Sequence, residues 1–417
     1  MLFSVHFFFR GARHHTAKFF QISYYNPVTG TFALGWDDIF FVFYWIIVFT
    51  GMRCAVMDYI LAPLAGWLGI RKNKVRVRFT EQAWILIYAI GFWSTGLYIM
   101  YHSEYWLNLR ALWRNWPIRE MDGLSKWYYL VQFAFWLQQI VVVNIEERRK
   151  DYWQMFSHHI ITCSLIFTSY GYHQSRVGNL ILCLMDLGDI FLPLAKLLKY
   201  LKCGLACDIC FGVFMVTWLI ARHLLYMCVC WSIYAHIPEE INYGCYKGSV
   251  TDLQGPFPTP DDLDHLLEPF RDPVGLVCWN NNIKWGFLSM LLALQFILLT
   301  WFVTIIRVAY RMISGQSADD VRSDEEDEEA EDEEVKEVDD ARVESQPFVE
   351  KEVLSTDANF SFPPTSNSSS PKPTSSSVRR SSRRRHENGH SSGVNLLAGS
   401  DRKELLGRIG CDKSPSD

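Results

Sequence analysis

The amino-acid sequence predicts an all-α fold, a polytopic bundle of about seven transmembrane helices followed by a disordered, acidic and serine-rich C-terminal tail. Of its 417 residues, 49% are hydrophobic and 15% are aromatic. The mean hydropathy is nevertheless only +0.02, because polar residues are concentrated towards the C-terminus. A membrane domain joined to a polar tail explains both observations.

Seven apolar segments have the length of a membrane-spanning helix, which is roughly 20 residues. The first contains Arg53, and the sixth contains Arg222 and His223 and is long enough to tilt or kink. The segments cover residues 38–57, 82–101, 127–144, 155–172, 177–199, 208–235 and 284–309.

The composition divides the chain into three parts. Residues 1–35 form an N-terminal segment, residues 36–315 the membrane domain, and residues 316–417 the tail. The apolar run at residues 2–9 is too short to cross a bilayer and lacks the small-residue cleavage site of a signal peptide. It predicts either an interfacial segment or the remainder of a longer N-terminal region.

The tail has too few apolar residues to form a core, so we expect it to be disordered. Residues 319–340 hold 15 Asp and Glu against two basic residues, and residues 361–377 are rich in Ser and Pro. Ser323 precedes three acidic residues and is a phosphorylation candidate for an acidophilic kinase. The alternative is that the tail is only a solvated tether.

Basic residues predict the orientation of the bundle. Clusters of Lys and Arg occur in every second loop, at residues 72–78, 148–150, 196–202 and 307–311. The positive-inside rule places these loops and the tail in the cytosol. The loops at residues 102–126, 173–176 and 236–283 then lie on the other side, although three arginines in the first of these reduce the contrast.

Two of the eleven cysteines differ from the rest. Most lie in apolar segments, where a small buried thiol is the ordinary interpretation. Cys245 and Cys278 both fall in the loop at residues 236–283, on the side where oxidation is permitted. They are candidates for a disulfide that closes this loop.

Four ionisable residues lie within two neighbouring apolar segments. His158 and His159 open the fourth segment, and Asp186 and Asp189 lie in the middle of the fifth. Ionisable groups at membrane depth are costly, so an intramembrane reaction site is the first hypothesis. Adjacent helical residues point about 100° apart, so the two histidines cannot share a direction, whereas the aspartates share one face. Gly188 between the aspartates allows close approach of a neighbouring helix.

A carboxylate beside an imidazole increases its basicity and fixes its tautomer. Such a histidine can deprotonate an amine or attack an acyl group. The alternative is a structural polar network between two helices. At ~1.5 Å per residue, His158 lies ~5 Å inside the cytosolic boundary and Asp189 roughly 15 Å inside it. Contact between the histidine pair and the aspartate pair therefore requires helix tilt or a fourth span that begins earlier.

At these residues the sequence resembles a known family. The stretch RRKDYWQMFSHHIIT at residues 148–162, with TSY at 168–170, RVG at 176–178 and MDLGD at 185–189, resembles the signature of the ceramide synthases, the sphingoid-base N-acyltransferases built on the TLC domain. The similarity extends from about Tyr24 to Arg311. YYNP at 24–27 and GWDD at 35–38 resemble the region ahead of this domain in fungal members. Family members usually carry a further N-terminal membrane segment, which this chain lacks or has only as residues 2–9.

The resemblance implies a multi-pass enzyme of the endoplasmic reticulum that transfers a fatty acyl group from acyl-CoA to the amine of a sphingoid base. It implies that His158 and His159 are catalytic and that Asp186 and Asp189 polarise them. Which histidine is the nucleophile or base stays open. We expect no cofactor beyond the acyl-CoA substrate, no metal and no nucleic-acid partner. Family members often associate with themselves or with an accessory subunit.

Acyl-CoA has a charged head and an apolar chain, so its site requires a cationic mouth above a tunnel at lipid depth. Arg148, Arg149 and Lys150 are candidates for binding the CoA phosphates, or they are positive-inside anchors. Arg222 is a candidate lining residue, but an ion pair with Asp186 or Asp189 explains it equally well. We expect acyl-chain length to depend on the closed lumenal end of the tunnel, formed by the sixth and seventh spans and their loop.

Three other functions are alternatives to this one. A di-iron lipid hydroxylase needs many more histidines at short spacings. A proton-coupled transporter usually shows repeated halves, and none is visible in the sequence. A non-catalytic TLC-domain protein that senses or transports lipids is expected to lack part of the His-His and Asp-x-x-Asp set. The intact set favours the enzyme.

Overall fold

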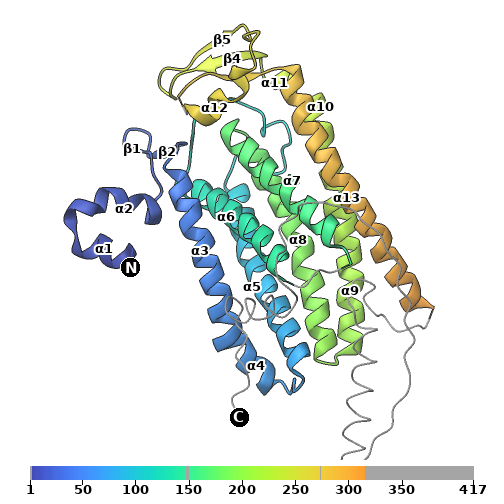
Figure 1. The fold of residues 1–417 in the computed structure, drawn as a ribbon. Coiled ribbons are helices and arrows are strands. Elements are labelled where there is room, and N and C mark those ends of the chain that lie inside the picture. The colour runs from blue at the N-terminus through green and yellow to red at the C-terminus, as the bar shows by residue number, and fades with distance from the viewer. Residues whose placement is uncertain (1, 147–149, 273, 315–417) are drawn as a thin grey trace, which may run out of the picture. The chain divides into compact units, whose positions relative to one another are not determined.

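A computed structural model describes residues 2–146, 150–272 and 274–314 as a helical bundle (Figure 1). The predicted tail and Ser323 lie outside the described residues. All seven predicted spans are helical. They are α3 (Asp38–Val56), α5 (Asn73–Tyr101), α6 (Gly123–Ile145), α7 (Tyr152–Gly171), α8 (Ser175–Tyr200), α9 (Gly204–Leu219) with α10 (Tyr226–Ala235), and α13 (Asn281–Ile313).

Within the described residues, five helices are long and apolar enough to cross a membrane. One is α3 continued through η2 (Met57–Leu61) and α4 (Ala62–Trp67), and another is α9 continued through η3 (Ile220–Leu225) into α10; the others are α5, α6 and α13. The remaining two, α7 and α8, carry the paired histidines and aspartates, and these polar residues lower their hydropathy.

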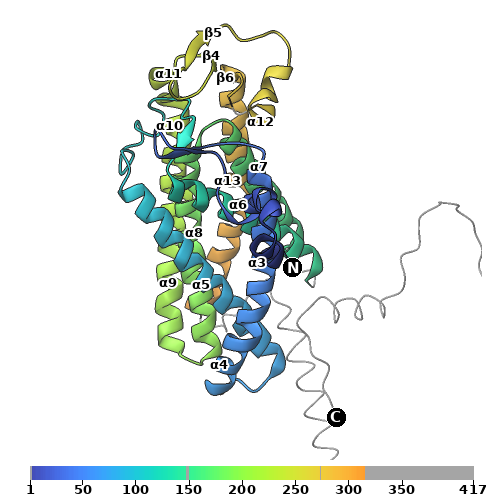
Figure 2. The same cartoon turned by 90° about the vertical axis from the view of Figure 1, so that its left-hand side faces the viewer.

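Helix packing places α7 and α8 in different neighbourhoods. Helix α8 packs mainly against α5 and α9, whereas α7 packs mainly against α6 and α13. Helices α6 and α7 run obliquely to α5, α8 and α9, and the last turn of α6 and the first turn of α7 lie well short of the end of the bundle formed by α4 (Figures 1 and 2). Helix α7 also begins at Tyr152, three residues before the predicted start. The structure thus has both the tilt and the earlier start, which reduce the expected difference in depth between His158 and Asp189.

The sixth span contains a π-helical turn, η3, with α-helix on both sides. This turn holds Arg222 and His223, the two polar residues that made the span irregular in the sequence. A π-helical turn carries one extra residue per turn and occurs often at functional sites. Here it directs two consecutive polar side chains to different neighbours.

One end of the bundle is covered by residues 236–280, which we call the cap (Figure 1). Its sheet has the antiparallel order β5-β4-β6, which an all-α prediction did not include. A second small sheet joins the N-terminal strands to β3 (Glu120–Met121). The cap elements are α11 (Ile237–Glu240), β4 (Gly244–Lys247), β5 (Gln254–Phe257), η4 (Asp264–Leu266), α12 (Glu268–Arg271) and β6 (Val277–Trp279).

The predicted disulfide is confirmed and fastens the cap. Cys245 in β4 and Cys278 in β6 are paired opposite each other in the sheet and bonded. Replacing both by serine is expected to lower the free energy of unfolding by about 2–4 kcal/mol, because the unfolded chain loses a cross-link over 33 residues. Thermal unfolding of the purified protein measures this loss. Cys228→Ser, at an exposed free cysteine, is the control, and an equal effect of both changes would contradict the assignment.

A buried arginine joins the cap to the turn between α7 and α8. Arg119 donates to the carbonyl oxygens of Tyr246 and Gly275, both at 2.9 Å, and lies 3.3 Å from Nε2 of His173. Burial lowers the pKa of Arg119 to about 10, so it stays charged at neutral pH. Burial and the adjacent Arg119 lower the pKa of His173 from 6.5 to about 3, so this imidazole is neutral in the folded protein.

This neutral histidine predicts an acid sensitivity of the cap. Between pH 6.5 and 3 the unfolded chain binds a proton at His173 and the folded chain does not, so stability falls as the pH falls below 6.5. At pH 5.5 the loss is about 1–2 kcal/mol relative to pH 7.5. His173→Asn should reduce this loss, because the asparagine side chain does not bind a proton in this pH range. Asparagine also tolerates the φ of +56° at this position. Melting curves of wild type and His173→Asn at pH 7.5 and 5.5 test this prediction. An equal fall in melting temperature in both proteins would exclude His173 as the cause of the acid sensitivity.

The N-terminal residues form α1 (Leu2–Phe8), η1 (Arg10–Ala12), α2 (Arg13–Phe20) and a hairpin of β1 (Tyr25–Asn26) and β2 (Thr31–Ala33). Helix α1 has only seven residues, as expected for a segment too short to span a bilayer. The hairpin is held by a buried lysine of α6. Lys126 lies 2.8 Å from Oδ1 of Asp38 and donates to the carbonyl oxygens of Ser23 and Ala33 at 3.1 and 2.6 Å.

Candidate active site

His158 lies in the first half of α7 and is almost fully buried. Its ring lies between two tryptophans, with centroid distances of 6.0 Å to Trp136 of α6 and 5.2 Å to Trp301 of α13. Nδ1 of His158 has no hydrogen-bond partner among the described residues. The side chain lines an internal cavity, so its imidazole can meet a ligand there.

His159 points elsewhere, as the 100° rotation between neighbouring residues predicts. Its ring centroid lies 5.5 Å from that of Trp136 and 5.5 Å from that of His158. Neither ring nitrogen has a partner in the described part of the chain, and His159 is not among the residues lining the cavity. The two histidines therefore have different environments, and only His158 faces the cavity.

Asp186 is held by a glutamine that the sequence analysis missed. Nε2 of Gln132 in α6 donates to Oδ2 of Asp186 at 2.8 Å, and Tyr88 of α5 donates to Oε1 of Gln132 at 2.5 Å. Gln132 is fully buried. Burying an amide in the middle of an apolar span costs free energy unless the amide is hydrogen-bonded. A glutamine within the predicted span 127–144 could therefore have indicated a polar partner on another helix.

Asp189 forms an ion pair with Arg222 of η3. Nη2 of Arg222 donates to Oδ1 of Asp189 and to the carbonyl oxygen of Met185, both at 2.6 Å. The guanidinium also lies over Trp218, 4.1 Å from the ring centroid. A side chain at Gly188 would reach within 3.0 Å of Nε of Arg222. The sequence predicted close approach of a neighbouring helix at Gly188, and in the structure the Arg222 side chain of that helix fills this space.

The four predicted residues form one electrostatic cluster without direct bonds between the two pairs. Among the described residues, neither histidine forms a hydrogen bond or ion pair with Asp186 or Asp189. Arg222 bonds on the side of the aspartates, to Asp189 and to the carbonyl oxygen of Met185. Polarisation of a histidine by an aspartate therefore stays a prediction.

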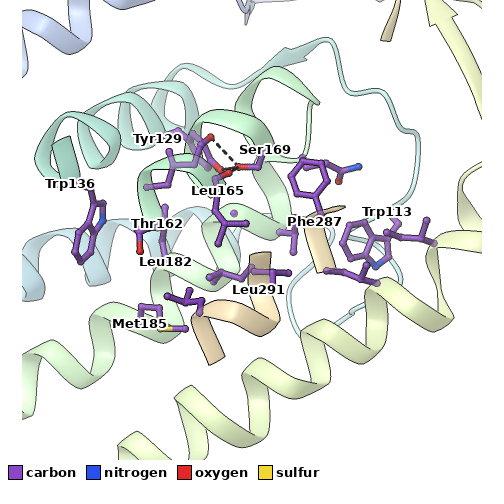
Figure 3. A pocket seen from close by; sticks show the side chains of 18 of the residues that line it. Trp113, Tyr129, Trp136, Thr162, Leu165, Ser169, Leu182, Met185, Phe287 and Leu291 are labelled. Atoms are coloured by element: carbon purple, nitrogen blue, oxygen red, sulfur yellow. Dashed lines mark hydrogen bonds between the residues drawn. The ribbon is translucent and has the colours of Figure 1, made fainter. Parts of the chain in front are cut away.

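The cavity beside His158 encloses about 730 Å³, including space at its open side. It follows α7 from His158 to Ser169, eleven residues or roughly 16 Å at ~1.5 Å per residue. In Figure 3, Trp136 lies at one end and Trp113 at the other, with Leu165 and Leu291 between them. Ile237 and Trp279 of the cap also line it. The walls are almost entirely apolar, so the cavity suits a long hydrocarbon chain.

The predicted cationic mouth is only partly described. Lys150 lies in the turn before α7 and is exposed, whereas Arg148 and Arg149 lie outside the described residues. His158 lies eight residues after Lys150. Binding of the CoA phosphates by these three residues stays a prediction.

The fold and the site define a class of protein, a polytopic helical membrane protein with an intramembrane histidine, aspartate and arginine cluster at the end of an apolar cavity. The family model of the TLC domain matches residues 78–307. The chain belongs to the TLC-domain family, as the resemblance of its motifs implied.

Several fungal relatives match most of this chain. It is 50% identical over 309 residues to a sphingosine N-acyltransferase-like protein, ALT7, of Alternaria alternata, covering 73% of this chain and 71% of the relative. It is 44% identical to the ceramide synthase FUM18 of Gibberella moniliformis, covering 77% and 75%. It is 40% identical to the sphingosine N-acyltransferase lag1 of Schizosaccharomyces pombe, covering 76% and 74%.

Proposed function

We propose that this protein is a ceramide synthase, an N-acyltransferase that joins the acyl group of a fatty acyl-CoA to the amine of a sphingoid base. The single observation that carries the proposal is the position of His158 at the end of a long apolar cavity. A reactive imidazole at that point meets the carbonyl of a fatty chain lying in the cavity. The names of the relatives agree with this chemistry.

The geometry favours His158 over His159 as the reacting residue. The His158 imidazole attacks the thioester carbonyl, the C–S bond breaks, and the CoA thiolate leaves and takes up the N–H proton that the acylated ring releases. The amine of the base then attacks the acyl-imidazole, the bond from carbon to nitrogen of His158 breaks, and the amine proton passes to the released imidazole. No cofactor beyond the acyl-CoA substrate is needed for these steps.

The charged cluster has a supporting role in this proposal. Negative charge develops on the carbonyl oxygen in both steps, and in this proposal the buried guanidinium of Arg222 favours it electrostatically. Asp189 fixes the guanidinium through the 2.6 Å ion pair. Gln132 in turn fixes Asp186 beside the same cluster. Lys150, with Arg148 and Arg149, supplies positive charge for the CoA phosphates.

The same proposal places the protein in the membrane of the endoplasmic reticulum. The basic loops and the C-terminal tail face the cytosol, where acyl-CoA is available. The cap then faces the lumen, and the Cys245–Cys278 disulfide agrees with an oxidising compartment.

The test is an amide-formation assay in microsomes that lack other such enzymes, supplied with acyl-CoA and a sphingoid base. Ceramide production above the level of empty microsomes supports the proposal. If the protein is correctly inserted and makes no ceramide, a non-catalytic lipid-sensing or lipid-transport role takes its place.

The end of the cavity in the cap predicts the acyl-chain preference. Ile237 is fully buried and lines this end. Ile237→Ala lengthens the cavity, and Ile237→Phe fills it, so the preferred chain should shift by about one or two methylenes in opposite directions, at about 0.8 kcal/mol for each buried CH₂. Competition between acyl-CoAs of different length measures the shift. Ile241→Ala, at a buried cap residue that does not line the cavity, is the control. Equal shifts in all three variants would contradict the prediction.

A further inference from the structure

A second apolar depression lies on the outside of the bundle, between the sixth span and α13. We call it the lateral groove. Leu224, Met227 and Trp231 form one wall, and Leu292, Phe296 and Leu299 form the other. These six side chains are 42–69% exposed, and exposed apolar residues on transmembrane helices face the lipid chains. The groove is therefore open to the bilayer, with about 1380 Å³ including the space at its open side.

The groove contains a buried polar pair. His223 and Gln295 both line it, and only 8% and 7% of their surfaces are exposed. Nε2 of Gln295 lies 2.6 Å from Nδ1 of His223. Nε2 of His223 and Oε1 of Gln295 are buried without a hydrogen-bond partner among the described residues. Unpaired polar atoms at this depth are costly, which points to a ligand that satisfies them.

The pair specifies the chemistry of that ligand. When the amide of Gln295 donates to Nδ1, the neutral ring carries its hydrogen on Nε2. The groove then offers one donor, Nε2–H of His223, and one acceptor, Oε1 of Gln295. If the amide is turned round, the ring offers the acceptor and the amide offers the donor. In both arrangements the complementary group both donates and accepts, as a hydroxyl does.

The groove lies next to the reacting cluster. His223 follows Arg222 in the π-helical turn, and Arg222 binds Asp189 on the other side of that turn. Helix α13 carries Gln295 in the groove and Trp301 against His158, six residues apart or roughly 9 Å along the axis. A lipid docked in the groove thus contacts the same two helical segments that carry Arg222 and Trp301.

We propose that the lateral groove is the bilayer-side docking site for the sphingoid base, with a hydroxyl of the base bound by His223 and Gln295. This proposal rests on the proposed function. The internal cavity takes the acyl chain, so the second lipid substrate needs an apolar surface of its own. A sphingoid base supplies one alkyl chain for the apolar walls and a hydroxyl group next to its amine for the polar pair.

Steady-state kinetics test the polar pair. The double variant His223→Phe/Gln295→Leu removes both polar groups together and keeps a ring against Phe302, whose centroid lies 4.8 Å from that of His223. We expect the KM for the base to rise about tenfold or more, since two hydrogen bonds are lost. The KM for acyl-CoA should stay unchanged. Thr300→Val, which removes a hydroxyl from α13 outside the groove, is the matched control. An unchanged KM for the base would overturn the proposal.

Photo-crosslinking tests docking without turnover. A diazirine-bearing sphinganine is irradiated with full-length wild type and with the His158→Ala variant. Labelling of peptides from η3, α10 or α13 that excess sphinganine removes, and ceramide or a sterol does not, supports the proposal. Equal competition by ceramide or a sterol would assign the groove to another lipid. If wild type makes no ceramide but this labelling persists, the proposed function fails and the docking site stands.

Discussion

Replacing His158 by alanine is expected to reduce ceramide synthesis by about three orders of magnitude or more, because the variant loses the group that attacks the acyl carbonyl. His158 is the histidine that lines the cavity, between Trp136 and Trp301. The measurement is the rate of amide formation in microsomes at matched protein levels. His159→Ala is the paired variant and should cost less, because His159 contacts Trp136 from outside the cavity lining.

Mass spectrometry identifies the chemical role of His158 more directly. Wild type incubated with acyl-CoA and no base should gain the mass of one acyl group on the peptide that contains His158. His159→Ala should still be labelled, and His158→Ala should not. An acyl group on His159 would reverse the assignment. An active wild type that forms no adduct would show that His158 acts as a general base.

The sequence was most informative where the membrane imposes a large free-energy cost on a residue type or on an unpaired backbone. Apolar length predicts helices, and all seven predicted spans are helical. The cost of ionisable groups at lipid depth pointed to His158 and Asp186, and the side of the membrane pointed to Cys245 and Cys278. Helix length, the cost of a buried charge and the redox environment each depend on one segment and its solvent, and not on the positions of neighbouring helices.

The partners of the aspartates could not be predicted in the same way. Gln132 reaches Asp186 from α6, and Arg222 reaches Asp189 from a π-helical turn. These contacts depend on rotation, tilt and register between helices, which periodicity does not fix. The short cap strands could not be predicted for a related reason. Strand β6 has only three residues, and its pairing with β4 depends on the chain folding back over the bundle.

The second large effect is expected at the buried ion pair of Lys126 and Asp38. The two side chains are 0% and 4% exposed, and their charged atoms lie 2.8 Å apart. Lys126→Met leaves the carboxylate of Asp38 buried without its cation, so we expect a loss of about 3–5 kcal/mol in the free energy of unfolding. The double variant Lys126→Met/Asp38→Asn should recover part of this loss, since neither remaining group is charged. Thermal unfolding in detergent measures both.

A more exposed ion pair of the same geometry is the control. Lys18 lies 2.8 Å from Asp37, but the side chains are 30% and 24% exposed, so Lys18→Met should cost about 1 kcal/mol or less. The buried pair also reaches the cavity wall, because Tyr170 donates to Asp38 at 2.8 Å and stacks on Tyr129, which lines the cavity. Lys126→Met should therefore reduce ceramide synthesis as well as stability. If it is no more destabilising than Lys18→Met, the hairpin is held by its apolar contacts, and the ion pair has no structural role.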